Sequence, residues 1–262
     1  MGLSICALGS GSKGNSALIE GERTKILVDA GLSARTLKER LEYAYVSPGE
    51  IEGIVITHAH IDHTGGLPVW VKRYKTPVYV HYKTAPVISE LLGGYTNIVE
   101  IDDNDFFIGE LTVSPVTVSH DVPCIGCSVY SAGRKISVLT DLGILPERTA
   151  QNISDSDIVL LEANHDVDML LANPRYPAQL KRRILSNRGH LSNADCAEAA
   201  VRCARGGVRQ LILGHLSEQN NAPSLAYESV ARRLEEEGFA PGREVFVAVA
   251  VQSVPTGIFR IS

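Results

Sequence analysis

The segment THAHIDH (Thr57–His63) decides how this sequence is interpreted. It follows the apolar run GIVI, which is typical of a buried strand, and it places three histidines and an aspartate within six residues. Because side chains alternate along an extended backbone, His58 and His60 point the same way, whereas Asp62 and His63 fall on the turn into the next helix and can face a second position. The segment therefore predicts two adjacent metal sites.

Three further apolar runs end in a side chain that can bind a metal: TVSPVTVSH at His120, KISVLTD at Asp141 and QLILGH at His215. The last side chain of a strand lies at the rim of its sheet, so these endings can converge on one site without disturbing the core. Imidazoles and carboxylates packed together without a cation would suffer repulsion and desolvation. We therefore expect the cluster to hold metal.

Composition narrows the class of protein. The chain has 262 residues, of which 44% are hydrophobic, and this is enough for a large core, so we expect a single domain over residues 1–262. The net charge of −5 does not indicate a polyanionic partner, and any contact with nucleic acid must come from a local patch or from bound metal. The odd number of cysteines and the lack of a leader or a membrane-spanning run predict a cytoplasmic protein with no membrane partner.

Short strand-like runs recur along the chain and alternate with helical patterns, which predicts packed sheets with helices outside, an α/β (α+β) fold. The expected helices are Ala34–Tyr43, Gly66–Tyr74, Ala85–Leu92, Asn193–Ala204 and Leu225–Glu237. The least regular stretch, Asp166 to Arg188, is interpreted as an insertion near a functional edge.

The loop GSGSKGNS (Gly9–Ser16) has the spacing of a phosphate-binding P-loop, but Asn15 stands where that motif has lysine. The residues that follow form a strand pattern, whereas a P-loop requires a helix whose N-terminus meets the phosphate. We therefore predict a β-hairpin that binds no nucleotide.

The segment RGHLSNADC offers groups that could contact a phosphate. Ser192 and Asp195 have capping-box spacing, so His190 lies just before a helix N-terminus, where anions are stabilised. His190 and Ser192 are candidates for substrate contact, with His190 as general acid; the alternative is a histidine that only holds the turn. Four basic residues upstream could bind a DNA backbone or form a solvated face: Lys181, Arg182, Arg183 and Arg188.

Two weaker patterns leave alternatives open. Glu162, Asn164 and His165 end another strand at the same rim, where they could bind substrate or orient metal ligands. Cys124 and Cys127 have the spacing of a redox or zinc pair, but they have no second pair, so we predict a turn between strands.

THAHIDH matches the H-x-H-x-D-H signature of the metallo-β-lactamase-fold hydrolases. With GSGSKGNS, VDAGLS, VSHD, LTDLG, LLEAN and GHLSN, the chain resembles the small YycJ/WalJ-like branch of that superfamily, whose members are metal-dependent DNA exonucleases. The resemblance implies a four-layered αββα sandwich in which the opening loop lies over the metal site and Asn15 can reach substrate. It also implies that His58, His60 and His120 hold one ion, that Asp62, His63 and His215 hold the other, and that Asp141 bridges them.

Such a centre suits phosphodiester hydrolysis, because two cations about 3.5–4 Å apart stabilise the developing charge and turn a bridging water into hydroxide. The expected catalytic residues are Asp62, Asp141 and His190. Imidazole and carboxylate ligands suit two divalent ions of zinc or manganese, with iron possible.

The alternatives to a DNA exonuclease are a small-molecule cyclic phosphodiesterase and another esterase or thioesterase of this fold. Asp141 stands where β-lactamases of the superfamily commonly carry cysteine, which counts against a β-lactam substrate. His60 stands where the diiron reductases of this fold usually carry glutamate, which counts against non-hydrolytic redox chemistry.

Overall fold

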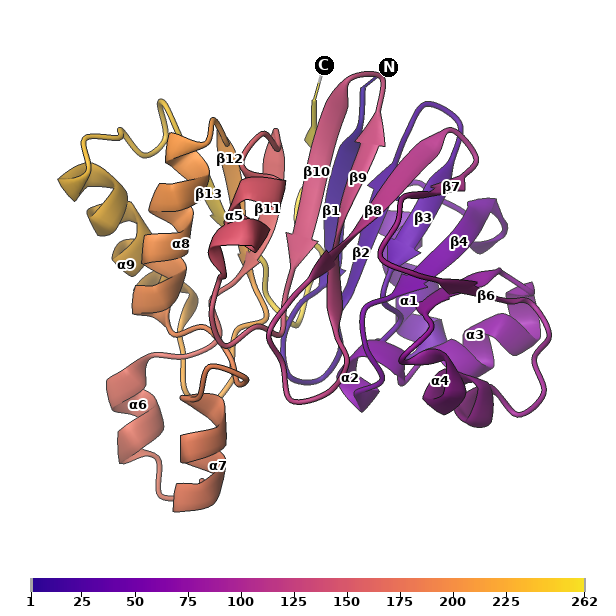
Figure 1. Cartoon of the computed structure of the whole chain (residues 1–262), viewed down its shortest axis with the longest axis horizontal. Helices are drawn as coiled ribbons and strands as arrows, with labels where there is room; N and C mark the ends of the chain where they lie inside the picture. Colours follow the sequence, from indigo (N-terminus) through magenta and orange to yellow (C-terminus); the bar gives the residue numbers. More distant parts are fainter. Residues whose placement is uncertain (1, 262) are drawn as a thin grey trace.

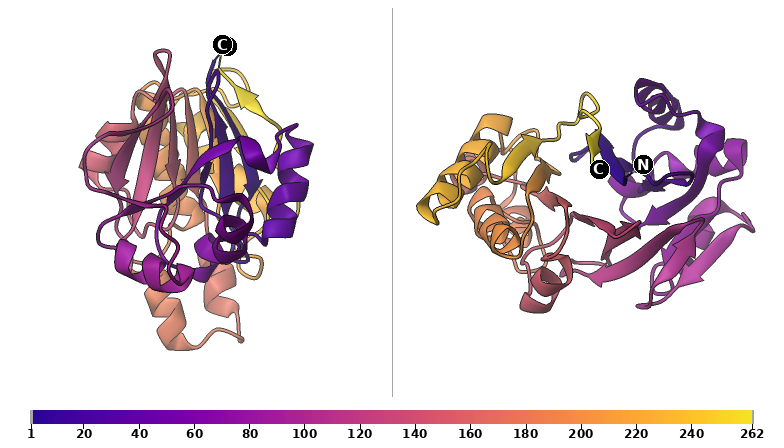
Figure 2. Two further views of the ribbon diagram at one scale, coloured as in Figure 1. Left: turned by 90° about the vertical axis from the view of Figure 1, so that its right-hand side faces the viewer. Right: turned by 90° about the horizontal axis from the view of Figure 1, so that it is seen from above.

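The computed structural model describes residues 2–261, and within them the chain forms two seven-stranded sheets packed face to face (Figures 1 and 2). The first sheet has the strand order β14-β1-β2-β3-β4-β5-β6, with β1 (Ser4–Gly9), β2 (Ser16–Glu20), β3 (Lys25–Val28), β4 (Ile51–Ile56), β5 (Val78–His81), β6 (Ile98–Ile101) and β14 (Phe259–Arg260). The second has the order β13-β12-β11-β10-β9-β8-β7, with β7 (Phe106–Ile108), β8 (Leu111–Thr117), β9 (Ile125–Ser131), β10 (Arg134–Leu139), β11 (Ile158–Glu162), β12 (Gln210–Gly214) and β13 (Phe246–Val249).

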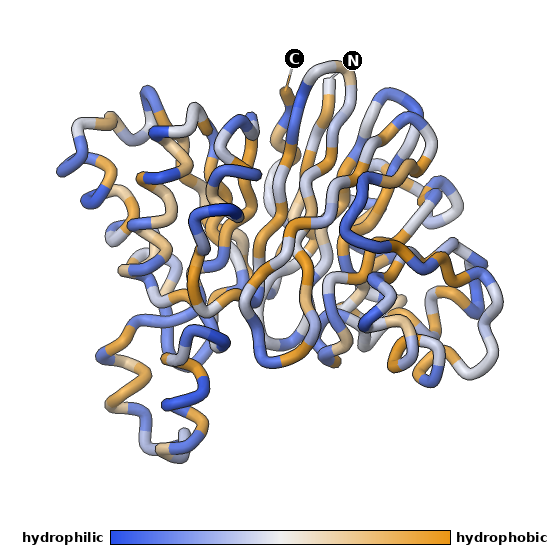
Figure 3. Tube along the Cα trace, viewed as in Figure 1, coloured by the Kyte–Doolittle hydropathy of each residue, from blue (hydrophilic) through white to orange (hydrophobic). Residues whose placement is uncertain are grey.

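The strands are apolar on both faces because each sheet is covered on both sides. In β1, Ile5 and Ala7 belong to the core between the sheets, whereas Cys6 and Leu8 pack under the helices of the first sheet. This assignment follows the two-residue alternation of a strand. Hydrophobic segments accordingly follow the strands through the centre of the molecule (Figure 3).

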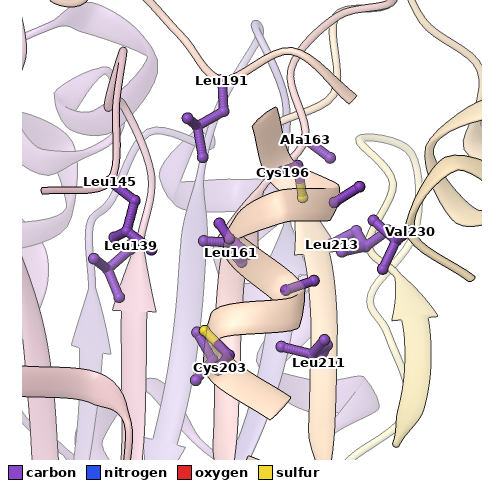
Figure 4. Packing of buried hydrophobic residues seen from close by; sticks show 14 of the residues in the cluster. Leu139, Leu145, Leu161, Ala163, Leu191, Cys196, Cys203, Leu211, Leu213 and Val230 are labelled. Carbon is purple, nitrogen blue, oxygen red and sulfur yellow. The ribbon is translucent and has the colours of Figure 1, made fainter. Parts of the chain in front are cut away.

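Helices form the two outer layers. The first sheet is covered by α1 (Ala34–Tyr43), α3 (Leu67–Tyr74) and α4 (Ala85–Leu92), and the second by α5 (Glu147–Ile153), α8 (Asn193–Arg205) and α9 (Pro223–Glu236). Figure 4 shows Cys196 and Cys203 of α8 beside Leu161 of β11 and Leu211 and Leu213 of β12. The predicted four-layered αββα sandwich is confirmed.

The ends of several parallel strands meet at one edge of the sandwich. Strands β3 to β6 are parallel to one another, as are β10 to β13, so the loops after β4, β10, β11 and β12 lie at the same edge. The short helix α2 (Ile61–Thr64) lies at this lower edge in Figure 1. The predicted hairpin is also correct, because β1 and β2 pair antiparallel on either side of the GSGSKGNS loop.

The stretch from Asp166 to Arg188, expected to be irregular, contains two helices, α6 (Val167–Ala172) and α7 (Ala178–Ile184). We call residues 166–188 the arm; it projects beyond the sandwich at the same lower edge (Figures 1 and 2). The Asp166 side chain caps α6 by accepting from the Met169 N–H at 2.9 Å, and Lys181 Nζ donates to the Leu171 carbonyl at 2.6 Å. These helices are too short for their periodicity to be recognised, so the sequence analysis missed them. The position of the arm agrees with the interpretation of this stretch as an insertion near a functional edge.

The prediction of a turn at CIGC is wrong at Cys127, which lies inside β9, with Cys124 just before the strand. Both thiols are buried, and burial raises the pKa of Cys127 to about 12, so it is a protonated core residue. Among residues 2–261, no helix has the length and apolar character needed to cross a membrane.

Candidate metal centre

The structure brings all seven expected ligands together at the edge described above. The ligand atoms of His58, His60 and His120 lie within 4.8 Å of one another. The same holds for a second group, Asp62, His63 and His215.

Asp141 lies between these groups. Its carboxylate lies within 4.8 Å of ligand atoms of His58, from the first group, and of His63 and His215, from the second. Its Oδ2 is 3.0 Å from His63 Nε2. The Asp141 carboxylate could therefore contact a cation held by either group.

The seven clustered residues fit a divalent cation for two reasons: their donor atoms are of the right chemical type, and some of these atoms have no hydrogen-bond partner. His58 and His120 are buried, and their Nε2 atoms have no hydrogen-bond partner among the described residues. Leaving buried polar atoms unpaired costs about 1–3 kcal/mol each, and coordination would remove that cost. Imidazole nitrogens and carboxylate oxygens suit zinc, manganese and iron.

The electrostatic environment keeps two histidines of the first group, His58 and His120, neutral, as metal ligands must be. Burial, and then the neighbouring His63, lowers the pKa of His58 to about 2, and burial also lowers the pKa of His120. Burial alone would raise the pKa of Asp62, but its hydrogen bond from His215 holds that pKa at about 2. His58 and His120 therefore face the cluster as neutral imidazoles. Burial alone would lower the pKa of His63 and of His215, but Asp141 and Asp29 raise that of His63 to about 10, and Asp141, Asp62 and Glu162 raise that of His215. These two imidazoles are protonated beside the carboxylates, and a cation bound there would displace their protons.

Two of the seven expected ligands have a strained backbone conformation. Asp141 has φ of 60° and His215 has φ of 57°, both in the left-handed region that residues other than glycine seldom adopt. Each follows a strand of the second sheet, and the unusual φ turns its side chain from the strand direction into the cluster. Such strain costs about 1–3 kcal/mol per residue and is found at functional sites.

Asp29, which the sequence analysis did not identify, fixes the orientation of His63. Its Oδ2 is 2.7 Å from His63 Nδ1, and its two carboxylate oxygens also accept from the Thr57 hydroxyl at 3.0 and 2.8 Å. Because Nδ1 is held in this way, Nε2 is the nitrogen that faces the cluster. Asp29 directly follows β3, so the pattern of a strand ending in a polar side chain could have revealed it.

Glu162 plays the same part for two other histidines. Its Oε1 is 2.8 Å from both His190 Nδ1 and His215 Nδ1, and its Oε2 accepts from the Leu142 N–H at 2.9 Å. Burial alone would raise the pKa of Glu162, but His190 and His215 hold it at about 2, so this carboxylate is charged. Of the two roles that the sequence left open for Glu162, the contacts fit orientation of the ligands.

The opening loop lies against the cluster, as the resemblance implied. Asn15 Nδ2 is 3.0 Å from His63 Nε2 and 3.4 Å from Asp62 Oδ2, and its Oδ1 accepts from the Gly11 N–H at 2.8 Å. Ser10 of the same loop accepts from the His215 N–H at 2.7 Å. The loop therefore braces the cluster as well as bordering it.

A cavity of about 200 Å³ opens beside the cluster. Its walls include Asp62, Asp141, Asn164, His190 and His215 from the sandwich and Tyr176, Leu180 and Arg183 from the arm. A larger cavity, of about 580 Å³, lies between β8 and α5, and no histidine of residues 2–261 lines it. The donor chemistry therefore assigns the site to the smaller cavity.

The candidate substrate contacts separate into two kinds. Asn164 lines the cavity while its Nδ2 donates to the His215 carbonyl at 2.9 Å, and His190 lines it with Nδ1 already held by Glu162. Ser192 is buried and caps α8, accepting from the Asp195 N–H at 3.1 Å, and His165 is 1% exposed. Neither Ser192 nor His165 is among the cavity-lining residues, so the structure does not bring these two candidates to the site.

The basic residues of the arm have different surroundings. Arg188 donates from Nε to the His120 carbonyl at 2.9 Å and from Nη2 to the Asp121 carbonyl at 3.0 Å, so it holds the loop after β8. Arg183 lines the cavity, and Arg182 is exposed.

Comparison with known proteins gives a consistent result. The sequence profile of the metallo-beta-lactamase superfamily matches residues 9–215. An exodeoxyribonuclease YycJ of Bacillus anthracis is 35% identical over 98% of this chain and 99% of its own length. An exodeoxyribonuclease WalJ of Streptococcus pneumoniae is also 35% identical, over 92% of each chain. The crystal structure of the metallo-beta-lactamase fold protein YhfI from Bacillus subtilis aligns over 100% of both chains with a TM-score of 0.73 and 16% identity, which shows a shared fold.

Proposed function

The chain belongs to the metallo-β-lactamase superfamily, and from this we propose that it is a metal-dependent exodeoxyribonuclease, which hydrolyses phosphodiester bonds at the ends of DNA. The observation that carries the proposal is the convergence of seven donors on one edge, in a chain similar over nearly its full length to two exodeoxyribonucleases. The five cysteines are free thiols, which favours the reducing cytoplasm as its location.

The proposed ligands are those that the cluster groups: His58, His60 and His120 for one ion, Asp62, His63 and His215 for the other, with Asp141 shared. Zinc or manganese held there would neutralise charge on the scissile phosphate and lower the pKa of water to about 7. Asp29 and Glu162 keep the ligating histidines in the required orientation through hydrogen bonds at their Nδ1 atoms.

His190 is the proposed general acid. Its Nδ1 is held by Glu162, so Nε2 is the nitrogen left to reach a substrate in the cavity that His190 lines. There it can donate a proton to the leaving 3′ or 5′ oxygen, a step that contributes about 10²- to 10⁴-fold in rate. Asn164 supplies an amide group at the wall of the same space, whereas Asn15, which is buried and does not line it, places its amide against His63 Nε2.

The test is an assay of the purified protein, loaded with zinc or with manganese, on end-labelled single-stranded and double-stranded DNA, with metal analysis of the same sample. We expect mononucleotides or short products released from one end. His60→Ala should lose both metal and activity, whereas His81→Gln, a change outside the cluster, should keep both. Hydrolysis confined to small phosphodiesters would contradict the assignment and support a cyclic phosphodiesterase.

A further inference from the structure

Asp121 presents a carboxylate oxygen to the first group of histidines, although it is not one of the seven expected ligands. Its Oδ1 is 3.2 Å from His120 Nε2 and 3.5 Å from His60 Nε2. Asp121 Oδ1 and His120 Nε2 are both buried, and neither has a hydrogen-bond partner among residues 2–261. The two atoms are therefore close without being placed to share a proton.

These separations are those of ligands that share an ion. Donor atoms about 2.1 Å from one metal ion, with angles of about 90–110° between them, lie about 3.0–3.4 Å apart. Asp121 Oδ1 stands at about this distance from both nitrogens, so a cation held by His60 and His120 would also meet this oxygen.

The arm holds Asp121 in this position. The other carboxylate oxygen, Oδ2, is 3.3 Å from Arg183 Nη1, and Arg188 binds the main-chain carbonyls of His120 and Asp121. Arg183 also lines the cavity. Asp121 is thus held from two sides, with Oδ1 facing the histidines and Oδ2 facing the arm.

We propose that Asp121 is a further metal ligand, which adds a carboxylate oxygen to the ion held by His58, His60 and His120, and that Arg183 positions it. The inference rests on the metal centre of the proposed function. A fourth protein donor that is a hard oxygen raises the coordination number and favours manganese over zinc, because zinc is satisfied by few nitrogen ligands in tetrahedral geometry. Asp121 therefore biases this position towards manganese.

The experiment measures metal binding without DNA. Apo protein is titrated with Mn(II), free Mn(II) is followed by electron paramagnetic resonance, and Zn(II) affinity is obtained by competition with a chromophoric chelator. In Asp121→Asn and Asp121→Ala we expect the Mn(II) affinity of one of two sites to fall by about 10- to 100-fold, and the Zn(II) affinity to fall less. Asp105→Asn, the same charge change at an exposed position on the β6–β7 loop, should bind both metals like the wild type.

Arg183→Gln separates ligation from ion pairing. It removes the partner of Oδ2 but leaves the carboxylate, so we expect a much smaller loss of Mn(II) affinity than in Asp121→Asn. Thermal unfolding of each apo variant checks that it is folded.

Unchanged Mn(II) binding in folded Asp121→Asn would overturn the inference, and so would an equal loss in Arg183→Gln. Wild-type protein that binds neither metal would contradict the metal centre itself. Wild-type protein that binds metal but leaves DNA intact would contradict only the proposed nuclease.

Discussion

At the scale of single residues, one carboxylate oxygen couples a ligand to the proposed acid. Glu162 Oε1 is 2.8 Å from Nδ1 of both His190 and His215, so the orientation of the two rings depends on the same buried atom. Both rings line the cavity, and His215 Nε2 is in addition 3.3 Å from Asp62 Oδ2. The two histidines share the same partner, and in the proposed function His215 binds metal while His190 donates a proton.

We therefore predict that His190→Ala lowers turnover of DNA by about 10²- to 10⁴-fold while the protein keeps its full metal content. The reason is that removal of this ring leaves the seven proposed ligands intact. Single-turnover rates and metal analysis of the same preparation check it. Loss of metal from His190→Ala would show instead that this histidine belongs to the structure of the centre.

At the scale of elements, the loop before α1 and the metal motif are packed without room for a side chain. A methyl group on Gly31 would lie 1.7 Å from the Asp62 carbonyl oxygen, and the Gly31 N–H donates to the Asn15 carbonyl at 2.9 Å. Glycine is therefore required where three loops of the site meet.

Gly31→Ala should destabilise the protein by about 1–3 kcal/mol and weaken metal binding, because the loop with Asp62 must move to admit the methyl group. Gly49→Ala is the matched control, since nothing lies within 4 Å of a methyl group there. Urea unfolding of the apo forms and metal titration measure the two effects. Equal stability of the two variants would contradict this account of the packing.

A second prediction at this scale concerns the contact between the arm and DNA. Arg182 is exposed on α7, next in sequence to the cavity-lining Arg183. Arg182→Gln should therefore raise the KM for DNA. It should also reduce the slope of log KM against log salt concentration by about 0.7–0.9, because one contact with a phosphate is lost. Arg232→Gln on α9, another exposed arginine, should leave both unchanged. KM values measured across a range of salt concentrations test this, and an unchanged slope in Arg182→Gln would mean that the basic face of the arm is only solvated.

The elements also show what the sequence could and could not predict. Runs that end in His58, His120 and His215 predicted both the strands and the meeting of their ends, because alternation and strand direction are local properties. The helices of the arm were missed because α6 has six residues and α7 seven, too few for a period of 3.6 to repeat. The proximity of Asp121 to His60 depends on how two distant loops pack, and no local pattern records it.

At the scale of the whole molecule, the cluster lies across both sheets. His58 and His63 follow a strand of the first sheet, whereas Asp141 and His215 follow strands of the second, so the site requires the sheets to keep their relative position. The opposite edge has its own tie between the sheets. Glu110, in the β7–β8 turn, accepts from the N–H groups of Arg23 and Thr24 at 2.7 and 3.0 Å and from the Thr24 hydroxyl at 2.8 Å.

Glu110→Gln should therefore lower the free energy of unfolding by about 1–2 kcal/mol at pH 7, because a charged acceptor of three hydrogen bonds is lost at a partly exposed position. Burial alone would raise the pKa of Glu110, but the bonds from Arg23 and Thr24 lower it to about 2 from an ordinary value of 4.5. A lowered pKa in the folded state means that the stabilisation is complete above pH 4.5 and is lost as the pH falls towards 2. The difference in free energy of unfolding between wild type and variant, measured by urea unfolding, should be constant from pH 7 to 5 and shrink at pH 4 and 3. DNA turnover at pH 7 should be unchanged, because this edge is remote from the cluster. A difference that did not depend on pH would show that the carboxylate charge does not hold the two sheets together here.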